Sequence, residues 1–546
     1  MPTRRLVCIV FLLTLAVRIV AALNTCAISA DGPEYVKVAK WYLAGEYDSA
    51  VRHAYHPLYP ILTATFYSVI GDWEAAGQAV SVLFSSLAVI PLFLLTRRLF
   101  DDRHALVAST LYAFWPYAAV YSAAVLTTGL YLFLFTTGVW AAVEAVATKR
   151  IGCFALAGLF FAMAYLDRVD GLVLVPAFAV GIVILLFVKE KPSRDREGAT
   201  RSGTGVPPVP GTGMIVTPST SSTPPQPVRA WNRILLLAAG SAVSAVVFLA
   251  VAFPFLSAIH EATGRWKLTM KMSSEEVTQI FSVDAGKGIA SGGAAARTSV
   301  GLLAQDYAES THYLIVVLLG VGLLQRSIRS RDRVALLFVL LVVAVNMLFL
   351  VRFGIVAGRM SRRYSVGLTT LGLPWAVAGL AYISTWIWRL YTEWRCRRKG
   401  MAAPAEAAGP FVIVWPAVAF GLIISVLACV PKTFVPTAWN KQDEVEAAEY
   451  IREHATAKPV RVMTYLERVA FYAEGEQVAF PAGARTTKEI VEHAQSKGVE
   501  FLAVDKNIDR VSAAFMPADC PDLEAVFASG MYTDGKNMVR VYRVKR

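Results

Sequence analysis

The sequence is poor in charged residues. Asp, Glu, Lys and Arg make up 17% of its 546 residues, whereas ordinary soluble domains contain about 25%. Hydrophobic residues account for 56%. A chain of this length has room for several soluble domains, but apolar runs of about 20 residues recur along it. We therefore predict a polytopic α-helical membrane protein.

Cysteines are also few, and the six are scattered without a CxxC pair or a metal-like spacing. The sequence thus predicts neither a disulfide framework nor a zinc site. Acidic residues are outnumbered by basic ones, which gives a net charge of +13. Most of the excess lies in short tracts beside apolar runs, as topology signals do. We interpret these basic residues as signals that orient the protein in the membrane, and we expect no nucleic-acid partner.

The apolar runs predict about eleven transmembrane helices. Orientation follows from lysine and arginine in the short loops. Arg4 and Arg5 precede the first span, so we place the N-terminus in the cytoplasm, and every second loop is then basic. An odd number of spans places 431–546 outside the cytoplasm. The expected spans are 5–23, 75–96, 105–123, 126–147, 151–167, 171–189, 233–256, 312–325, 333–352, 365–388 and 410–430.

The first apolar run also has features of a cleaved signal peptide, since a basic start precedes it and small residues follow. Arg18 interrupts the run, and no clear A-x-A site comes after it. An uncleaved membrane span is therefore the favoured interpretation. On this topology the protein lies in the cytoplasmic (inner) membrane, and its transmembrane domain covers 1–430.

Two long segments lie between spans. Residues 192–229 are rich in Pro, Gly, Ser and Thr, a composition that cannot bury enough apolar surface to fold, and we predict a disordered cytoplasmic loop. Residues 257–311 form a longer extracytoplasmic loop with the stretch GKGIASGGAAA. A partly mobile lid over an active site and a passive connector both fit this segment.

The residues after the last span change character. Helical and strand patterns alternate there, which is typical of a small α/β domain. We predict one such extracytoplasmic domain over 431–546, with no recognisable catalytic set. The expected helices are 439–455 and 487–498, and the expected strands are 459–465, 499–505 and 538–545.

Polar residues collect where the first span leaves the membrane. Asp31 and Glu34 are three residues apart, and in a helix this spacing places both carboxylates on one face. A helix cap at Asp31, beside Gly-Pro, explains that residue equally well. Residues 55–71 follow as an amphipathic aromatic helix, too short and too polar for a span, and we place it in the membrane interface.

Two other clusters lie on the predicted outer face. The turn DRVDG at 167–171 carries two acids and an arginine, and a polar turn between spans explains it as well as a functional site does. The loop 352–364 breaks the positive-inside rule. Guanidinium groups hold phosphate well, although a solvated loop or lipid headgroup contact also fits. Its arginines are Arg352, Arg359, Arg362 and Arg363.

Together these clusters indicate a reaction type. A carboxylate can remove a proton from an attacking hydroxyl, and arginines can stabilise a departing phosphate as its charge develops. This division of labour suits group transfer from a lipid phosphate to an acceptor outside the cytoplasm.

The order of these motifs resembles the GT-C superfamily of integral-membrane glycosyltransferases, and within it the protein O-mannosyltransferase and aminoarabinose transferase group. The resembling features cover most of 1–430: Arg18 late in the first span, the D-x-x-E-Y of Asp31, Glu34 and Tyr35, the HPLYP segment, the DRVDG turn, and RRYSVGLTTLGLP at 362–374. A small outside α/β domain at the end is also common in that group.

The resemblance implies a GT-C-like fold and transfer of a sugar, with inversion, from a polyprenyl-phosphate donor to a lipid or protein hydroxyl. Asp31 is then the general base, and Glu34 supports it or positions the acceptor. The donor phosphate is held by Arg359, Arg362 and Arg363, with Tyr364 lining the cavity. The other cavity-lining residues are Tyr35, His56, Asp167, Arg168 and Asp170.

This sequence departs from the group in one respect. Many relatives have Asp and Glu adjacent, whereas Gly32 and Pro33 separate them here, so which carboxylate is the base stays open. Relatives with and without a metal both occur. We assign no metal ligands and no cofactor, because a polar loop explains His53 and His56 better, and this leaves dependence on a divalent metal open.

Two other classes of function remain. A lipid or sugar transporter or flippase places charges and broken helices at mid-membrane and often contains internal repeats. We find no matching halves, and the polar clusters lie at the outer edge. A non-catalytic membrane protein whose outside domain binds a partner predicts that the outside carboxylates are dispensable.

Overall fold

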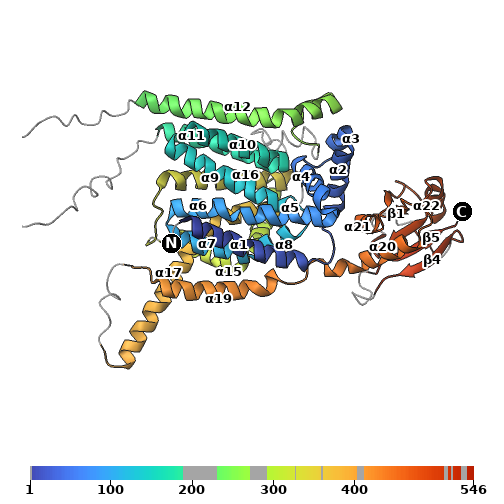
Figure 1. Cartoon of the computed structure of the whole chain (residues 1–546). Coiled ribbons are helices and arrows are strands. Elements are labelled where there is room, and N and C mark those ends of the chain that lie inside the picture. The colour runs from blue at the N-terminus through green and yellow to red at the C-terminus, as the bar shows by residue number, and fades with distance from the viewer. Residues whose placement is uncertain are drawn as a thin grey trace, which may run out of the picture.

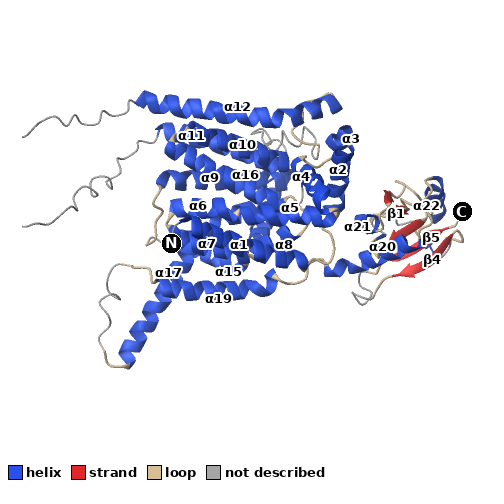
Figure 2. Ribbon diagram, in the orientation of Figure 1, coloured by secondary structure: helices blue, strands red, loops and turns tan. Residues whose placement is uncertain are grey.

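The computed structural model describes residues 3–187, 230–270, 292–325, 327–357, 361–401, 411–508, 515–517, 520–530 and 538–545. Most helices run side by side in one bundle, and a small sheet with its helices lies beyond one end of that bundle (Figure 1). The N-terminus lies at the opposite end. Among the residues that the structure describes, Figure 2 shows strands in this C-terminal unit alone. The predicted disordered loop 192–229 lies outside the described residues.

The bundle is built almost entirely from apolar helices. Its core contains α9 and the first two-thirds of α17. Phe135, Ala142, Leu371 and Ala378 of these helices are fully buried. The helices are α1 (Thr3–Leu23), α2 (Gly32–Ala44), α3 (Tyr47–Arg52), α4 (Leu58–Ile70), α5 (Trp73–Leu87), α6 (Val89–Leu99), α7 (Asp102–Phe114), α8 (Pro116–Ala123), α9 (Thr128–Thr148), α10 (Ile151–Asp167), η1 (Val169–Val173), α11 (Leu174–Phe187), α12 (Ala230–Thr263), α14 (Gly292–Thr311), α15 (Tyr313–Leu324), α16 (Arg333–Ala357), η4 (Arg362–Ser365), α17 (Val366–Arg398) and α19 (Trp415–Thr433).

The predicted count of eleven spans is not confirmed. Among the described residues, eight helices are long and apolar enough to cross a membrane, and a pair bent by 106° at His312 makes a ninth if it counts as one span. The expected span 151–167 is a helix just below that length. The expected loop 257–311 includes the end of α12 and all of α14, and its residues 271–291 lie outside the described part.

The expected continuous span 105–123 is broken. Helix α7 ends at Phe114, Trp115 is extended, and α8 begins at Pro116, because the residue before a proline disfavours helical backbone. Arg18, fully buried in α1, donates to the carbonyl oxygens of Tyr112 at 2.9 Å and Ala113 at 3.0 Å. A charged side chain in an apolar span thus adds hydrogen bonds to carbonyls in the last turn of α7.

Helices α15 and α17 touch through glycines. A Cβ added to Gly322 would lie 1.8 Å from the carbonyl oxygen of Trp375, and one added to Gly379 would lie 1.9 Å from that of Leu318. Small residues allow membrane helices to approach this closely, because packing rather than burial from water drives their association.

Alanine at Gly322 is therefore expected to destabilise the bundle, because its methyl group would force α15 and α17 apart. Overpacking of this kind costs about 1–3 kcal/mol. Gly320 on the same helix provides the control, since no atom lies within 4 Å of the added Cβ. Thermal unfolding in detergent should show a lower midpoint for Gly322→Ala than for Gly320→Ala. Equal midpoints would contradict the close contact.

The C-terminal unit contains a five-stranded sheet with the order β2-β1-β3-β5-β4. The first three strands of that order are parallel, and β5 runs antiparallel to both of its neighbours. The predicted last strand thus lies inside the sheet rather than at its edge. The elements are η5 (Trp439–Lys441), α20 (Gln442–His454), β1 (Arg461–Met463), α21 (Glu467–Tyr472), β2 (Glu476–Val478), α22 (Thr487–Ser496), β3 (Phe501–Val504), β4 (Leu523–Ala528) and β5 (Arg540–Val544).

Alternation along the strands produces two hydrophobic layers in this unit. Met463, Leu502 and Tyr542 pack with α22 on one face of the sheet. Their chain neighbours Phe501 and Val541 pack with α20 and α21 on the other face. Successive side chains of a strand point to opposite faces, so the sheet is covered by helices on both sides.

Candidate active site

Asp31 occupies the N-cap position of α2, but its side chain does not cap the helix. Within the described part of the chain its side chain makes no capping hydrogen bond, so the cap interpretation is wrong. Its Oδ2 instead lies 2.7 Å from Nη2 of Arg363 in η4, and the two side chains are 30% and 25% exposed. The fold thus joins the carboxylate segment after α1 to the arginine loop before α17.

Arg168 forms a second ion pair beside the first. It follows the last residue of α10, and its Nε and Nη2 each donate to one oxygen of Asp170 at 2.9 Å. Its guanidinium carbon lies over the rings of Tyr131 and Tyr364, at 4.8 and 5.1 Å from their centroids. A bidentate pair stacked on aromatic rings fixes the plane of the guanidinium.

Tyr35 lies close to both ion pairs. It is buried, packs against the ring of Tyr55 at 4.3 Å, and is within electrostatic reach of Asp31, Arg363 and Arg168. Burial raises the pKa of Tyr35, so the phenol stays neutral. The guanidiniums of Arg363 and Arg168 are themselves close enough to repel each other.

The remaining predicted residues lie in different surroundings. Arg362 pairs with Glu309 of α14 rather than with Asp31, and its side chain is 48% exposed. His56 is buried between the rings of Tyr165 and Phe255. Asp167 is also buried, and neither of its carboxylate oxygens has a hydrogen-bond partner among the described residues. Arg359 lies outside the described residues.

Glu34 faces other partners than Asp31 does. Its carboxylate accepts from His53 at 2.9 Å and from Lys37 at 3.4 Å. The hydrogen bond from His53 is the main cause that lowers the pKa of Glu34 below its ordinary value, and burial opposes it. The sequence interpretation attributed His53 to a polar loop, so this contact was missed.

Replacing His53 with alanine is expected to raise the pKa of Glu34. A carboxylate whose pKa is depressed in the folded state adds stability above its unfolded pKa and loses it as pH falls through the folded pKa. In His53→Ala this loss should begin at a higher pH. Thermal midpoints between pH 3 and 6 test the shift, with Lys37→Ala, at an exposed partner, as the weaker variant. Superimposable curves for His53→Ala and wild type would refute it.

A cleft of about 1010 Å³ opens beside Glu34, between the bundle and the C-terminal unit. One wall is formed by α2 and the link from α4 to α5, and the other by α21 and β2. Carboxylates in the lining outnumber basic side chains. The acidic residues are Glu34, Asp72, Glu74, Glu467, Glu474 and Glu476, and the basic ones are Lys37, Lys40 and Arg452.

Glu467 adds a third carboxylate that sequence reasoning missed. It begins α21 of the C-terminal unit and lines the cleft. Burial first, and then the negative charges of Glu34 and Asp31, raise the pKa of Glu467. No motif singled it out, because only the fold brings this helix to the end of the bundle. Among the described residues, no group of three His, Cys, Asp or Glu is arranged to hold a metal ion.

Comparison with known proteins supports the resemblance found in the sequence. Residues 52–196 match the family model of dolichyl-phosphate-mannose-protein mannosyltransferase. ArnT from Cupriavidus metallidurans, solved with undecaprenyl phosphate, has 14% identity and a TM-score of 0.56, over 98% of this chain and 97% of its own. A search of curated proteins returned no significant match.

Oligosaccharyltransferase structures from Archaeoglobus fulgidus are also similar. The apo form has 13% identity and a TM-score of 0.52, over 93% of this chain and 70% of its own. AglB from the same organism, in complex with an inhibitory peptide and a dolichol-phosphate, has 12% identity, a TM-score of 0.51 and the same coverage. The chain therefore shares the fold of these structures, and its described residues are mostly helical with a small C-terminal sheet.

Proposed function

We propose that this chain is a membrane glycosyltransferase. It moves a sugar from a polyprenyl-phosphate donor to a hydroxyl acceptor at the end of the bundle that faces the C-terminal unit. On the predicted topology this end lies outside the cytoplasm. The observation that carries the proposal is the ion pair of Asp31 and Arg363 beside the stacked guanidinium of Arg168.

These two arginines suit the donor phosphate. A guanidinium has five N–H donors, and the bidentate pair with Asp170 uses two of those of Arg168. Two guanidiniums that repel each other form a site where an anion is stabilised. Arg359 and Arg362 extend this role along the same loop, and Tyr364 shapes the cavity around it.

The reaction then follows from the placement of Asp31. Its carboxylate accepts the proton of the acceptor hydroxyl, and the oxygen attacks the anomeric carbon of the sugar. The bond from that carbon to the phosphate oxygen breaks, and its electron pair stays on the phosphate. Arg363 and Arg168 stabilise the charge that develops there. Attack opposite the leaving phosphate inverts the anomeric carbon.

The acceptor enters through the cleft beside Glu34. The cleft is lined by Glu34, three residues after Asp31, and its excess of carboxylates disfavours a strongly anionic acceptor. Glu34, held by His53, accepts a hydrogen bond from the acceptor, and Glu467 faces it from the other wall.

Transport of a lipid or sugar is the alternative function. Transporters place ionisable groups near mid-membrane on broken helices. Here the charged groups stand at helix ends: Asp167 is the last residue of α10, Asp31 precedes α2, and Arg363 lies in the link between α16 and α17. This placement favours chemistry at a membrane surface.

The test uses the purified full chain in detergent and in vesicles. Radiolabelled undecaprenyl-phosphate and dolichyl-phosphate sugars serve as donors, with a membrane lipid extract or a peptide mixture as acceptors. Transfer of label to an acceptor is the expected result. Movement of labelled lipid across the vesicle membrane without transfer would support the flippase alternative and overturn the enzyme proposal.

A further inference from the structure

The C-terminal unit is attached to the segment that carries Asp31. Backbone hydrogen bonds join the two chain regions: the N–H of Cys26 donates to the carbonyl oxygen of Thr437 at 3.0 Å, and the N–H of Thr437 donates to that of Asn24 at 3.1 Å. The link between α1 and α2 is therefore paired, like a short strand, with the chain leaving α19.

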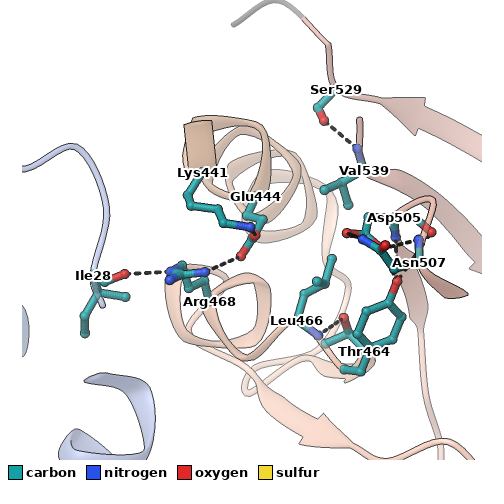
Figure 3. A network of polar contacts seen from close by, with 11 residues as sticks. Ile28, Lys441, Glu444, Thr464, Leu466, Arg468, Asp505, Asn507, Ser529 and Val539 are labelled. Atoms are coloured by element: carbon teal, nitrogen blue, oxygen red, sulfur yellow. Dashed lines mark hydrogen bonds and ion pairs between the residues drawn. The ribbon is translucent and has the colours of Figure 1, made fainter. Parts of the chain in front are cut away.

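Ile28 is the centre of the attachment. The side chain is fully buried, and α21 binds both backbone polar groups of the residue. Its N–H donates to the hydroxyl of Tyr472 at 2.6 Å. Its carbonyl oxygen accepts from Nε of Arg468 at 2.6 Å, as the dashed line in Figure 3 shows.

Both side chains that hold Ile28 are themselves fixed. Arg468 pairs with Glu444 at 3.1 Å, and Glu444 pairs with Lys441 at 2.9 Å; the side chains of Arg468 and Glu444 are 12% and 6% exposed. In Figure 3 this chain of charges runs from α20 to the Ile28 loop. The hydroxyl of Tyr472 donates to Glu74 at the start of α5, at 2.8 Å.

The path from Ile28 to Asp31 is short and tight. The N–H of Gly32 donates to the carbonyl oxygen of Ser29 at 3.0 Å, and the hydroxyl of Ser29 donates to that of Val125 at 2.7 Å. A Cβ at Gly32 would lie 2.5 Å from the side chain of Ile28. Because these contacts leave the turn little conformational freedom, a shift of Ile28 moves Asp31.

From these contacts we infer that α21 of the C-terminal unit completes the active site, with Arg468 and Tyr472 as positioning residues that hold Asp31 against Arg363 through Ile28. The inference rests on the proposed function and extends it, because it gives the C-terminal unit a role in the reaction. Displacing a catalytic group by about 1 Å costs on the order of 10²-fold in rate.

Conservative variants test the inference. Arg468→Lys keeps a positive charge for Glu444 but removes the Nε donor, and Tyr472→Phe removes only the hydroxyl. The matched controls are Arg461→Lys, at an exposed ion pair with Glu476, and Tyr465→Phe, whose hydroxyl contacts Asp505 within the same unit. Each variant is assayed as the full chain for sugar transfer, for thermal midpoint and for backbone hydrogen exchange.

In Arg468→Lys the turnover number should fall about a hundredfold, and in Tyr472→Phe about tenfold. The KM for the donor should stay within about twofold of the wild-type value. The thermal midpoint should stay within a few degrees of wild type. Amides of 26–31 should exchange faster in both, and not in the controls. In an Asp31→Asn background neither change should reduce transfer further, because residues that act through one group are not additive.

Unchanged turnover with unchanged exchange at 26–31 would overturn the inference, as would an equal loss in Arg461→Lys. Failure of the proposed function is a separate result, seen as no transfer from any donor by the wild-type chain. Hydrogen exchange then still tests whether α21 holds the loop 26–31. Faster exchange of these amides in Arg468→Lys would support that contact. Exchange at the wild-type rate in Arg468→Lys would exclude it.

Discussion

Asp31→Asn is expected to reduce sugar transfer by at least about a hundredfold, which is the lower range for loss of a general base. The amide has almost the same shape as the carboxylate, but it cannot accept the proton of the acceptor hydroxyl. Contact with Arg363 is weakened from an ion pair to a neutral hydrogen bond, so the arginine stays near its place. The measurement is the initial rate of transfer at saturating polyprenyl-phosphate sugar.

Glu34→Gln is the matched variant, because it makes the same chemical change one helical turn away. Glu34 contacts His53 and Lys37, so this variant should raise the KM for the acceptor more than it lowers turnover. Donor binding should survive in both variants, since neither carboxylate is assigned to the phosphate. A larger loss of turnover in Glu34→Gln than in Asp31→Asn would make Glu34 the general base and Asp31 the residue that positions the acceptor.

Hydropathy predicted most of the helix bundle because a bilayer requires long apolar helices, whatever their neighbours are. Hydropathy failed where a single residue breaks a helix that the average hydropathy of the segment predicts to be continuous. Pro116 breaks the span 105–123, and Arg18 of α1 donates to the carbonyl oxygens of Tyr112 and Ala113 at that break. The pairing is visible only in the fold, since α1 and α7 are separated by five helices along the chain.

The candidate site was predictable in its parts and not in its pairings. Arginines on the predicted outer face contradict the positive-inside rule, and that conflict drew attention to the loop of Arg362 and Arg363. Which of the two reaches Asp31 depends on η4, a single 3₁₀ turn that directs Arg363 to Asp31 and Arg362 to Glu309. A sequence pattern does not distinguish two adjacent arginines on such a turn.

The contribution of the C-terminal unit left no signal in the sequence. Glu467 and Arg468 begin a short amphipathic helix, and charged residues at such positions are usually solvated. Their roles arise from contact with residues about 440 positions earlier in the chain, as in the bond from Arg468 to Ile28. The short strands β2 and β4 were missed for a related reason, since the sheet rather than local propensity defines them.

Arg363→Gln is expected to weaken donor binding and to lower turnover by about 10²–10³-fold, the range for losing a group that stabilises a developing oxyanion. The neutral amide no longer balances the charge of the departing phosphate. It also leaves Asp31 without its ion pair, so the base loses its orientation. Binding of undecaprenyl phosphate, measured without acceptor, separates the loss of affinity from the loss of turnover.

The neighbouring Arg362→Gln is the control that makes this prediction sharp. Both substitutions remove one positive charge from the same turn, so any effect of net charge on an anionic donor is shared. Only Arg363 contacts Asp31 and lies beside Arg168, whereas Arg362 is half-exposed and pairs with Glu309. Arg363→Gln should therefore lose at least tenfold more turnover than Arg362→Gln. Equal losses would mean that the loop acts through its total charge, and a larger loss at Arg362 would place the phosphate on the side of Glu309.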